Sequence, residues 1–153
     1  MFSGILSTKN DIALTICRLV LGAVVFAHGA QKMLGWFGGR GFSGTISFYG
    51  HLGFSAPASV LAMGIEFFGG LALILGVLGR IAAFGVLCKM IYAVVTLHWQ
   101  FGFFMNWSGE PRAEGYEYYL LGMALGLMVL IRGSGALSFD EVYAKRDSTA
   151  KSK

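Results

Sequence analysis

The stretch IALTICRLVLGAVVFAHGAQKML, residues 12–34, decides the expected fold. A membrane-spanning helix needs about 20 consecutive, mostly apolar residues, and this stretch is long and apolar enough to be one. It nevertheless carries Arg18, His28, Gln31 and Lys32. A charge at the middle of a bilayer costs roughly 2.5 to 3.5 kcal/mol on insertion scales, so these side chains need polar partners on other helices.

The composition of the whole chain also favours a membrane protein. Its 153 residues are 56% hydrophobic and 13% charged, whereas charged residues make up about a quarter of an ordinary soluble domain. The length suits one compact domain and leaves no room for a second soluble one. The formal net charge of +4 comes from thinly spread basic residues. Because no basic stripe alternates with aromatic side chains, the sequence predicts no nucleic-acid binding.

Breakers and charges divide the apolar sequence into four segments, at residues 12–34, 57–78, 81–100 and 116–132. Each of them can span a bilayer. Pro57 suits the first turn of the second segment because its missing N–H would have no partner there. The turn before the third segment is short, so these two helices should be antiparallel neighbours. We therefore expect an all-α, integral membrane four-helix bundle that forms a single domain over residues 1–140.

The first loop on the outer side, residues 35–56, is rich in glycine and aromatic residues. Phe42, Ile46 and Tyr49 fall on one face of a helix at this spacing. We expect a short interfacial helix that lies on the outer leaflet. Further along, Tyr116, Tyr118 and Tyr119 follow an aromatic loop, which is typical of an interfacial aromatic belt.

The positions of Lys and Arg near the ends of the spans predict the orientation of the chain. One side of the membrane would hold Lys9, Arg80, Arg132, Lys145, Arg146, Lys151 and Lys153. The other side would hold only Lys32, Arg40 and Arg112. Both termini are therefore expected to face the cytoplasm. The charged, Ser- and Lys-rich tail at residues 141–153 is expected to be disordered.

An intramembrane charge cluster is expected on the inner half of the spans. Counting 1.5 Å per residue places Arg18, Lys89 and Glu66 at depths of about 9, 12 and 18 Å, within reach of one another. Because two cations would share one carboxylate, we expect Arg18 to pair with Glu66. Lys89 would then lose its proton, or hydrogen-bond to backbone carbonyls and Tyr92. Such a cluster either takes part in function or only clamps the helices together.

The face of the first helix that carries its charges is also lined with small residues. Arg18, Gly22, Val25, Gly29 and Lys32 form one stripe at heptad spacing. Small residues let two helix backbones approach closely. The first helix is therefore expected to pack through this stripe.

A second polar group is expected nearer the outer face, at depths of about 22 to 30 Å by the same count. Its members are His28, Gln31, Lys32, His98 and Glu117. They could bind a polar head group, pass protons to a quinone or hold a metal. In the simpler alternative, Lys32 and Glu117 extend to the interface while the histidines bond to loop carbonyls.

Candidate residues follow from this outer group. The catalytic candidates are His28, His98, Lys32 and Glu117, and the cofactor-binding candidates are His28, Gln31, Tyr92, His98 and Trp99. No HxxxH or carboxylate-histidine spacing occurs on one helix, so the sequence predicts no metal site.

Three blocks of sequence carry a resemblance to a known family. They are Arg18-x3-Gly22-x3-Phe26-x-His28-Gly29-x2-Lys32, then Glu66-x3-Gly70-x2-Leu73-x2-Gly76-x3-Arg80, then Gly133-Ser-Gly135-x2-Ser138-x-Asp140. In this order and at these spacings they resemble the signature blocks of the DoxX family, over roughly residues 12–140. The resemblance implies a four-helix protein of the bacterial inner membrane. The matching polar positions are Arg18, His28, Lys32, Glu66, Arg80 and Asp140, to which it assigns no catalytic roles.

The resemblance also implies a redox setting. The wider group includes a thiosulfate:quinone oxidoreductase subunit and members linked to thiol and oxidative-stress systems. We therefore expect a quinone- or thiol-linked oxidoreductase component with no covalently bound cofactor, in which His28 and His98 handle protons. Cys17 and Cys88 are far apart and lack the spacing of a redox pair.

Two other functions stay open. The chain could be a non-catalytic accessory subunit that docks on a larger respiratory or redox complex through its glycine-lined faces. It could also carry a small solute or a lipid, although four helices without a detectable repeat would then need to form a homo-oligomer.

Overall fold

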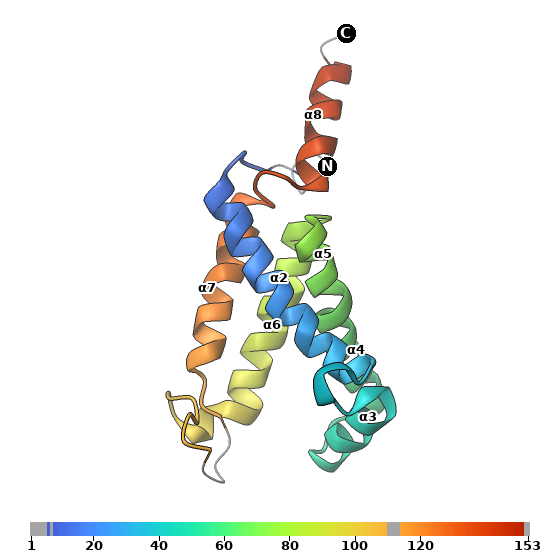
Figure 1. The fold of residues 1–153 in the computed structure, drawn as a ribbon, viewed down its shortest axis with the longest axis vertical. Coiled ribbons are helices and arrows are strands. Elements are labelled where there is room, and N and C mark those ends of the chain that lie inside the picture. The colour runs from blue at the N-terminus through green and yellow to red at the C-terminus, as the bar shows by residue number, and fades with distance from the viewer. Residues whose placement is uncertain (1–5, 7, 110–113, 152–153) are drawn as a thin grey trace.

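The computed structural model describes residues 6, 8–109 and 114–151. Every regular element in these residues is helical, and none of them lies in a β-strand. The long helices are α2 (Ile12–Met33), α6 (Gly79–Ala93) and α7 (Glu117–Arg132), together with the helix formed by α4 (Ala56–Gly64), η2 (Ile65–Gly69) and α5 (Gly70–Leu75). The shorter elements are η1 (Trp36–Gly38), α3 (Gly41–His51), η3 (Val94–His98), η4 (Trp99–Phe101) and α8 (Phe139–Lys151). In Figure 1, α2 lies between α7 on one side and α4–α5 on the other.

Among the described residues, three helices are long and apolar enough to cross a membrane: α2 (Ile12–Met33), α4 to α5 (Ala56–Leu75), and α6 continued by η3 and η4 (Gly79–Phe101). They match the first three expected spans. The fourth, α7, has 16 residues, which makes it about 24 Å long. This is shorter than the hydrocarbon core of a typical bilayer, about 30 Å. By length alone, α7 falls short of the expected fourth span.

Helix α2 packs against η2 and α5 through its glycine stripe, as predicted. A Cβ added at Gly22 would lie 2.9 Å from Ile74 N, and one at Gly29 would run into the backbone of Phe67. From the other helix, a Cβ at Gly70 would lie 2.5 Å from Phe26 N. The two backbones can approach this closely only because these positions lack side chains.

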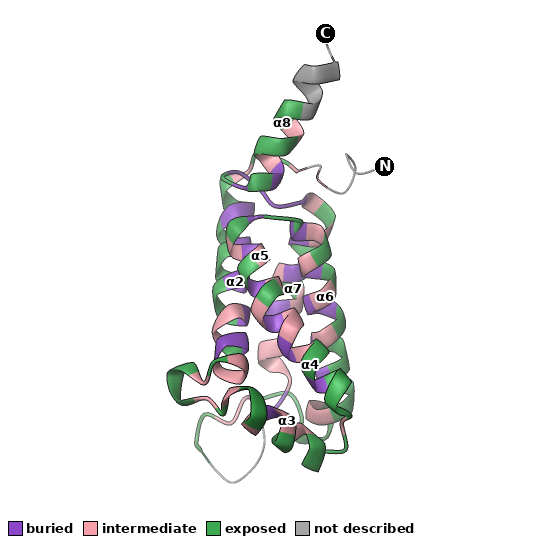
Figure 2. Cartoon of the chain, turned by 90° about the vertical axis from the view of Figure 1, so that its right-hand side faces the viewer, coloured by how far each residue is buried: buried purple, intermediate pink, exposed green. Residues whose placement is uncertain are grey.

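Apolar side chains from all four long helices meet between them. Helix α6 packs against α7, and the core residues are Leu14, Leu21, Val25, Leu73, Ala83, Val86, Met90 and Val129. Figure 2 shows the buried positions along the middle of the molecule and exposed positions around its outside. Many of the exposed positions are large and apolar, such as Leu121 at 67% and Ile131 at 61% exposed.

Arg18 is almost completely buried, at 1% exposed, but the expected ion pair with Glu66 is wrong. Its guanidinium instead donates to backbone carbonyls: Nε to Ser134 O at 2.7 Å, Nη1 to Ile74 O at 2.8 Å and to Leu73 O, and Nη2 to Leu137 O at 3.2 Å. The last carbonyls of a helix have no partner within it and carry its negative partial charge. Arg18 therefore caps the end of α5.

Asp140 caps the beginning of α6 in a matching way. Its Oδ1 accepts from Leu78 N at 2.8 Å, and its Oδ2 accepts from Gly79 N at 2.9 Å and from Ser134 Oγ. Leu78 has a φ of 50°, which is strained for a residue with a side chain. Arg18 and Asp140, with Ser134 between them, hold the tight turn between α5 and α6. We call these three residues the end clamp.

Arg80 stabilises the same end of the molecule. Its Nη1 donates to the carbonyls of Leu130 and Ile131, at the end of α7. Basic groups are favourable there because they complement the helix dipole. Arg80 and the third block of the family resemblance, residues 133–140, thus connect the ends of different helices.

The short helix expected within residues 35–56 is present as α3. It lies at the opposite end of the molecule from α8 (Figure 1). The hydroxyl of Thr45 donates to Lys32 O at 3.2 Å and so attaches α3 to the last turn of α2.

Helix α8 corrects the expectation of disorder in the tail. It covers residues 139–151, while residues 152–153 lie outside the described residues. It begins at Phe139, next to Asp140 of the end clamp, and projects away from the other helices (Figure 1). Asp140 and Glu141 in its first turn complement the positive end of the helix dipole. An argument from composition alone does not take this stabilisation into account.

Candidate functional site

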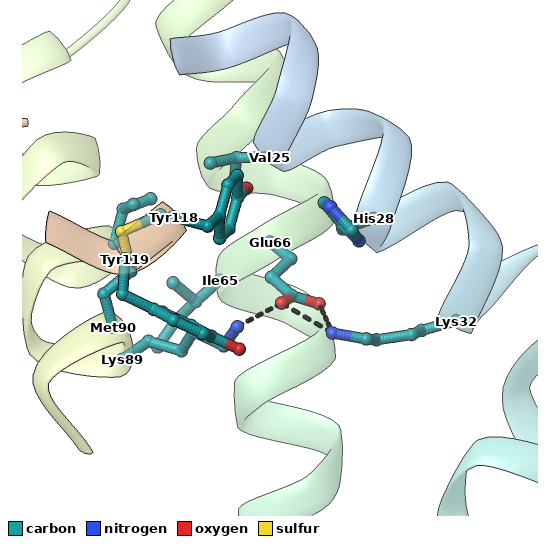
Figure 3. A pocket seen from close by; sticks show the side chains of 10 residues that line it. Val25, His28, Lys32, Ile65, Glu66, Lys89, Met90, Tyr118 and Tyr119 are labelled. Atoms are coloured by element: carbon teal, nitrogen blue, oxygen red, sulfur yellow. Dashed lines mark hydrogen bonds and ion pairs between the residues drawn. The ribbon is translucent and has the colours of Figure 1, made fainter. Parts of the chain in front are cut away.

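Glu66 is the centre of the polar site. Its side chain is 4% exposed and accepts hydrogen bonds from two lysines on different helices (Figure 3). The ammonium of Lys32, on α2, lies 2.6 Å from both carboxylate oxygens. The ammonium of Lys89, on α6, donates to Oε1. Three helices are therefore joined at one carboxylate.

The backbone around Glu66 departs from α-helical geometry. Glu66 lies in the π-helical turn η2, and such turns inside α-helices often occur at functional sites. A Cβ at Gly29 would come within 2.7 Å of the Glu66 carbonyl carbon, so the two backbones touch here. Lys32, one turn beyond Gly29, then lies beside the carboxylate.

This arrangement explains why the expected cluster was wrong in its membership. Glu66 lies level with Gly29, and Arg18 is 11 residues earlier on α2, about 16 Å along the helix axis. Lys32, which was expected in the outer group, takes the place predicted for Arg18. Lys89 bonds to the carboxylate rather than to backbone carbonyls and Tyr92.

A cavity of about 50 Å³ adjoins the carboxylate. This volume holds about three water molecules. The residues that line it are Val25, His28, Lys32, Ile65, Glu66, Val86, Lys89, Met90, Tyr118 and Tyr119. The cavity is therefore polar around Glu66 and apolar on its other walls.

The lining of the cavity includes one exposed residue, His28. The other described residues of the lining are buried or half-buried. The His28 ring lies on α2, 5.9 Å from the Tyr118 ring on α7. His28 lies near the end of α2 and Tyr118 lies in the first turn of α7, so the exposed part of the cavity lining is close to these ends of the two helices.

His98 lies outside the cavity and contacts it through Tyr119. Its Nδ1 is 2.8 Å from the Glu114 carbonyl oxygen, and its Nε2 is 2.8 Å from the Tyr119 hydroxyl. A carbonyl oxygen only accepts, so Nδ1 carries a proton, and in the neutral ring Nε2 accepts from the Tyr119 hydroxyl. His98 and Tyr119 therefore connect the cavity wall to the loop before α7, and His28 is not part of this connection.

Tyr49, on α3, lies close enough to the site for Glu66 and Lys89 to change the pKa of its phenol. Burial raises the pKa of the Tyr49 phenol above its ordinary value, the Glu66 carboxylate raises this pKa further, and the Lys89 ammonium lowers it. The phenol stays protonated at neutral pH. Tyr49 therefore adds no charge to the site.

The remaining candidates from the sequence lie away from the cavity. Gln31, Tyr92, Trp99 and Glu117 do not line it. The Glu117 carboxylate accepts from Met105 N at 3.2 Å and so holds the loop that precedes α7. Tyr92 and Trp99 are exposed on the outside of α6 and η4.

Sequence reasoning missed Tyr118 and Tyr119 as site residues. Both were expected in an interfacial aromatic belt, whereas both line the cavity. Consecutive helical residues point about 100° apart, so no periodic pattern predicts that two neighbouring tyrosines reach one cavity. A usable signal was that Tyr keeps a polar hydroxyl that needs a partner when the ring is buried.

Among the described residues, no group of three or more His, Cys, Asp or Glu side chains is placed to hold a metal ion. The residues that line the cavity supply two ammonium groups, one carboxylate, an imidazole and phenols. These groups can donate hydrogen bonds, hold charge and exchange protons.

Comparison with known proteins identifies the family of this chain. The model of the DoxX family matches residues 13–99. The chain belongs to the DoxX family. The DoxX match covers Lys32, Glu66 and Lys89, and it ends before Tyr118 and Tyr119.

Two relatives match over most of their own length. A protein of Bacillus subtilis (strain 168), named "Putative oxidoreductase CatD", is 28% identical over 135 residues, which is 88% of this chain and 90% of that protein. An uncharacterized protein of Haemophilus influenzae (strain ATCC 51907 / DSM 11121 / KW20 / Rd) is 31% identical over 142 residues, 87% of this chain and 92% of that protein. No solved structure matches this DoxX chain.

Proposed function

We propose that this DoxX chain is a four-span protein of a bacterial-type inner membrane, with both termini on the cytoplasmic side. Three helices are long enough to span, and the exposed Leu121 and Ile131 suit α7 to lipid contact. A short span is accommodated by local thinning of the bilayer or by residues that flank it. Helix α3 would lie on the outer leaflet, and the Lys and Arg distribution supports this orientation.

We further propose that the chain is a quinone-linked oxidoreductase component. The observation that carries this proposal is the cavity beside Glu66, in whose lining His28 is exposed. We expect the cavity to open beside His28, between α2 and α7, and we call this opening the mouth. If these two helices span the membrane, the mouth faces lipid near one interface. A ligand dissolved in the bilayer could then reach buried hydrogen-bond donors without crossing water.

The lining residues fit the head group of a quinone. Val25, Val86 and Met90 give apolar contact for a ring, while Lys32 and Lys89 offer donors for its oxygen atoms. A cavity of about 50 Å³ receives only the oxygen-bearing edge, so most of the ring would lie at the mouth. The name of the Bacillus subtilis relative is consistent with a redox role.

Quinone turnover tests this proposal. Purified protein in liposomes should support quinol oxidation or thiosulfate-dependent quinone reduction, and His28→Ala should lower kcat/KM at least tenfold, which is about 1.4 kcal/mol. The reason is that His28 forms the mouth of the cavity and is placed to bind the ring and exchange its proton.

His51→Ala is the matched control, because His51 lies on α3, does not line the cavity, and bonds only locally, to Ser47 O at 2.7 Å. Equal losses for the two variants, or no quinone chemistry in the wild type with either assay, would count against the proposal.

A non-catalytic accessory subunit is the second candidate. The observation in its favour is that Cys17 and Cys88 are both free and that neither lines the cavity, so a dithiol–disulfide couple would need a second thiol from a partner chain. Gly22, Gly29 and Gly70 are already used between helices of this chain, so a partner would dock elsewhere. A stoichiometric partner that co-purifies in mild detergent would support this candidate, and a homo-oligomer without partners would weaken it.

A further inference from the structure

The charges at the cavity do not balance. Lys32 and Lys89 contribute two ammonium groups, and Glu66 is the one acid among the described residues that line the cavity. The other titratable groups around the site are His28, Tyr49, Tyr118 and Tyr119. With both lysines protonated, the site carries one positive charge in excess.

Hydrogen bonding leaves the same excess. Each ammonium has three donors. Lys32 directs two of them to the carboxylate oxygens, and Lys89 directs one. Three N–H donors are therefore left beside the cavity. An uncompensated charge in a low-dielectric interior is costly. A ligand with one negative charge would neutralise the excess positive charge and accept hydrogen bonds from the unused N–H donors.

We propose that the cavity binds its ligand as a singly charged oxygen anion held between Lys32 and Lys89. This deepens the proposed function: for a quinone, the favoured form is the deprotonated reduced ring and not the neutral oxidised ring. The hydroquinone loses one proton from one hydroxyl to water when it binds, and no electron moves in this step. The anionic oxygen takes the free N–H donors, while the ring lies against His28 and Tyr118 at the mouth.

A nitrophenol tests the charge preference without redox chemistry. Its phenolate is coloured and its neutral form is not, so absorbance reports the form that is bound. The matched neutral ligand is 4-nitroanisole, the methyl ether, which has the same ring and cannot ionise. Both are titrated against the purified full-length protein in detergent, with empty micelles subtracted.

The wild type is expected to bind 4-nitrophenolate at least tenfold more tightly than 4-nitroanisole. A tenfold preference lowers the apparent pKa of the bound nitrophenol by about one unit relative to the nitrophenol in micelles. Lys89→Gln leaves the Lys32–Glu66 pair in place and removes the excess charge, so it should abolish the preference. Lys89→Arg keeps the charge and should retain it, which separates lost charge from misfolding.

Lys9→Gln is the control for a change of net charge, because Lys9 is exposed and precedes α2. Equal affinity for the two ligands, or a preference that persists in Lys89→Gln, would overturn the inference. Phenolate preference without quinone turnover would support this inference and contradict the proposed function. Turnover with no phenolate preference would contradict the inference alone.

Discussion

Glu66→Gln is expected to lower the free energy of unfolding by about 3 to 5 kcal/mol, the usual effect of removing one partner from a buried ion pair. The carboxylate joins α2, η2 and α6 at 4% exposure. Its loss leaves two ammonium groups facing each other across the cavity with no carboxylate between them. Denaturant titration of the purified protein in detergent, followed by circular dichroism, measures the change.

Glu114→Gln is the matched control, since Glu114 is exposed and an amide oxygen can replace its hydrogen bond to Asn106 N. Adding Lys89→Met to Glu66→Gln should recover part of the loss, because it removes one of the two unpaired charges. If Glu66→Gln were no less stable than Glu114→Gln, the ion pairs would not hold the helices together.

Arg18→Met is expected to be as damaging, with a loss of about 3 to 5 kcal/mol. The substitution removes the cap from the end of α5 and removes a positive charge that interacts with Asp140. Arg18→Lys should recover little, because an ammonium cannot reproduce the planar donors that reach carbonyls of α5 and of residues 134–137. Hydrogen exchange would locate the damage at the α5–α6 turn, where Leu78 N and Gly79 N should lose protection.

The exposed Arg40 provides the control, since it precedes α3 and stacks on Phe48 of that helix, with the guanidinium carbon 4.0 Å from the ring centroid. Arg40→Met should change stability by less than about 1 kcal/mol. Exchange that rises around Glu66 and not at the turn would show that Arg18 supports the polar site, contrary to the structure.

Much of the helical architecture could be predicted because it depends on local patterns. The apolar runs predicted the first three long helices. The spacing of Gly22 and Gly29 predicted the face through which α2 packs, since a close helix contact requires small residues wherever it occurs. The burial of Arg18 also followed from its place inside an apolar run.

The partners of the charged groups could not be predicted from depth alone. A count along each helix ignores the relative shift of two helices, and close contact at Gly29 sets that shift. It also treats charges as the natural partners of charges. Arg18 instead donates to carbonyls at the end of α5. These carbonyls are free to accept only because the helix ends there.

The candidate site was predicted in part. His28, Lys32, Glu66 and Lys89 were all identified, but they were divided between two clusters at different depths. The inward positions of Tyr118 and Tyr119 depend on where α7 begins and how it packs against α6. Helix propensities do not predict the π-helical turn at Glu66, because they do not distinguish π-helical from α-helical residues.

The most direct test of the account is an experimental structure of the purified protein in lipid nanodiscs with a quinone added. We expect ring density at the mouth between His28 and Tyr118, with one oxygen within hydrogen-bond distance of Lys32 or Lys89. Quinone density elsewhere on the chain, with Glu66, Lys32 and Lys89 enclosed by packed side chains and no path to the lipid, would contradict it.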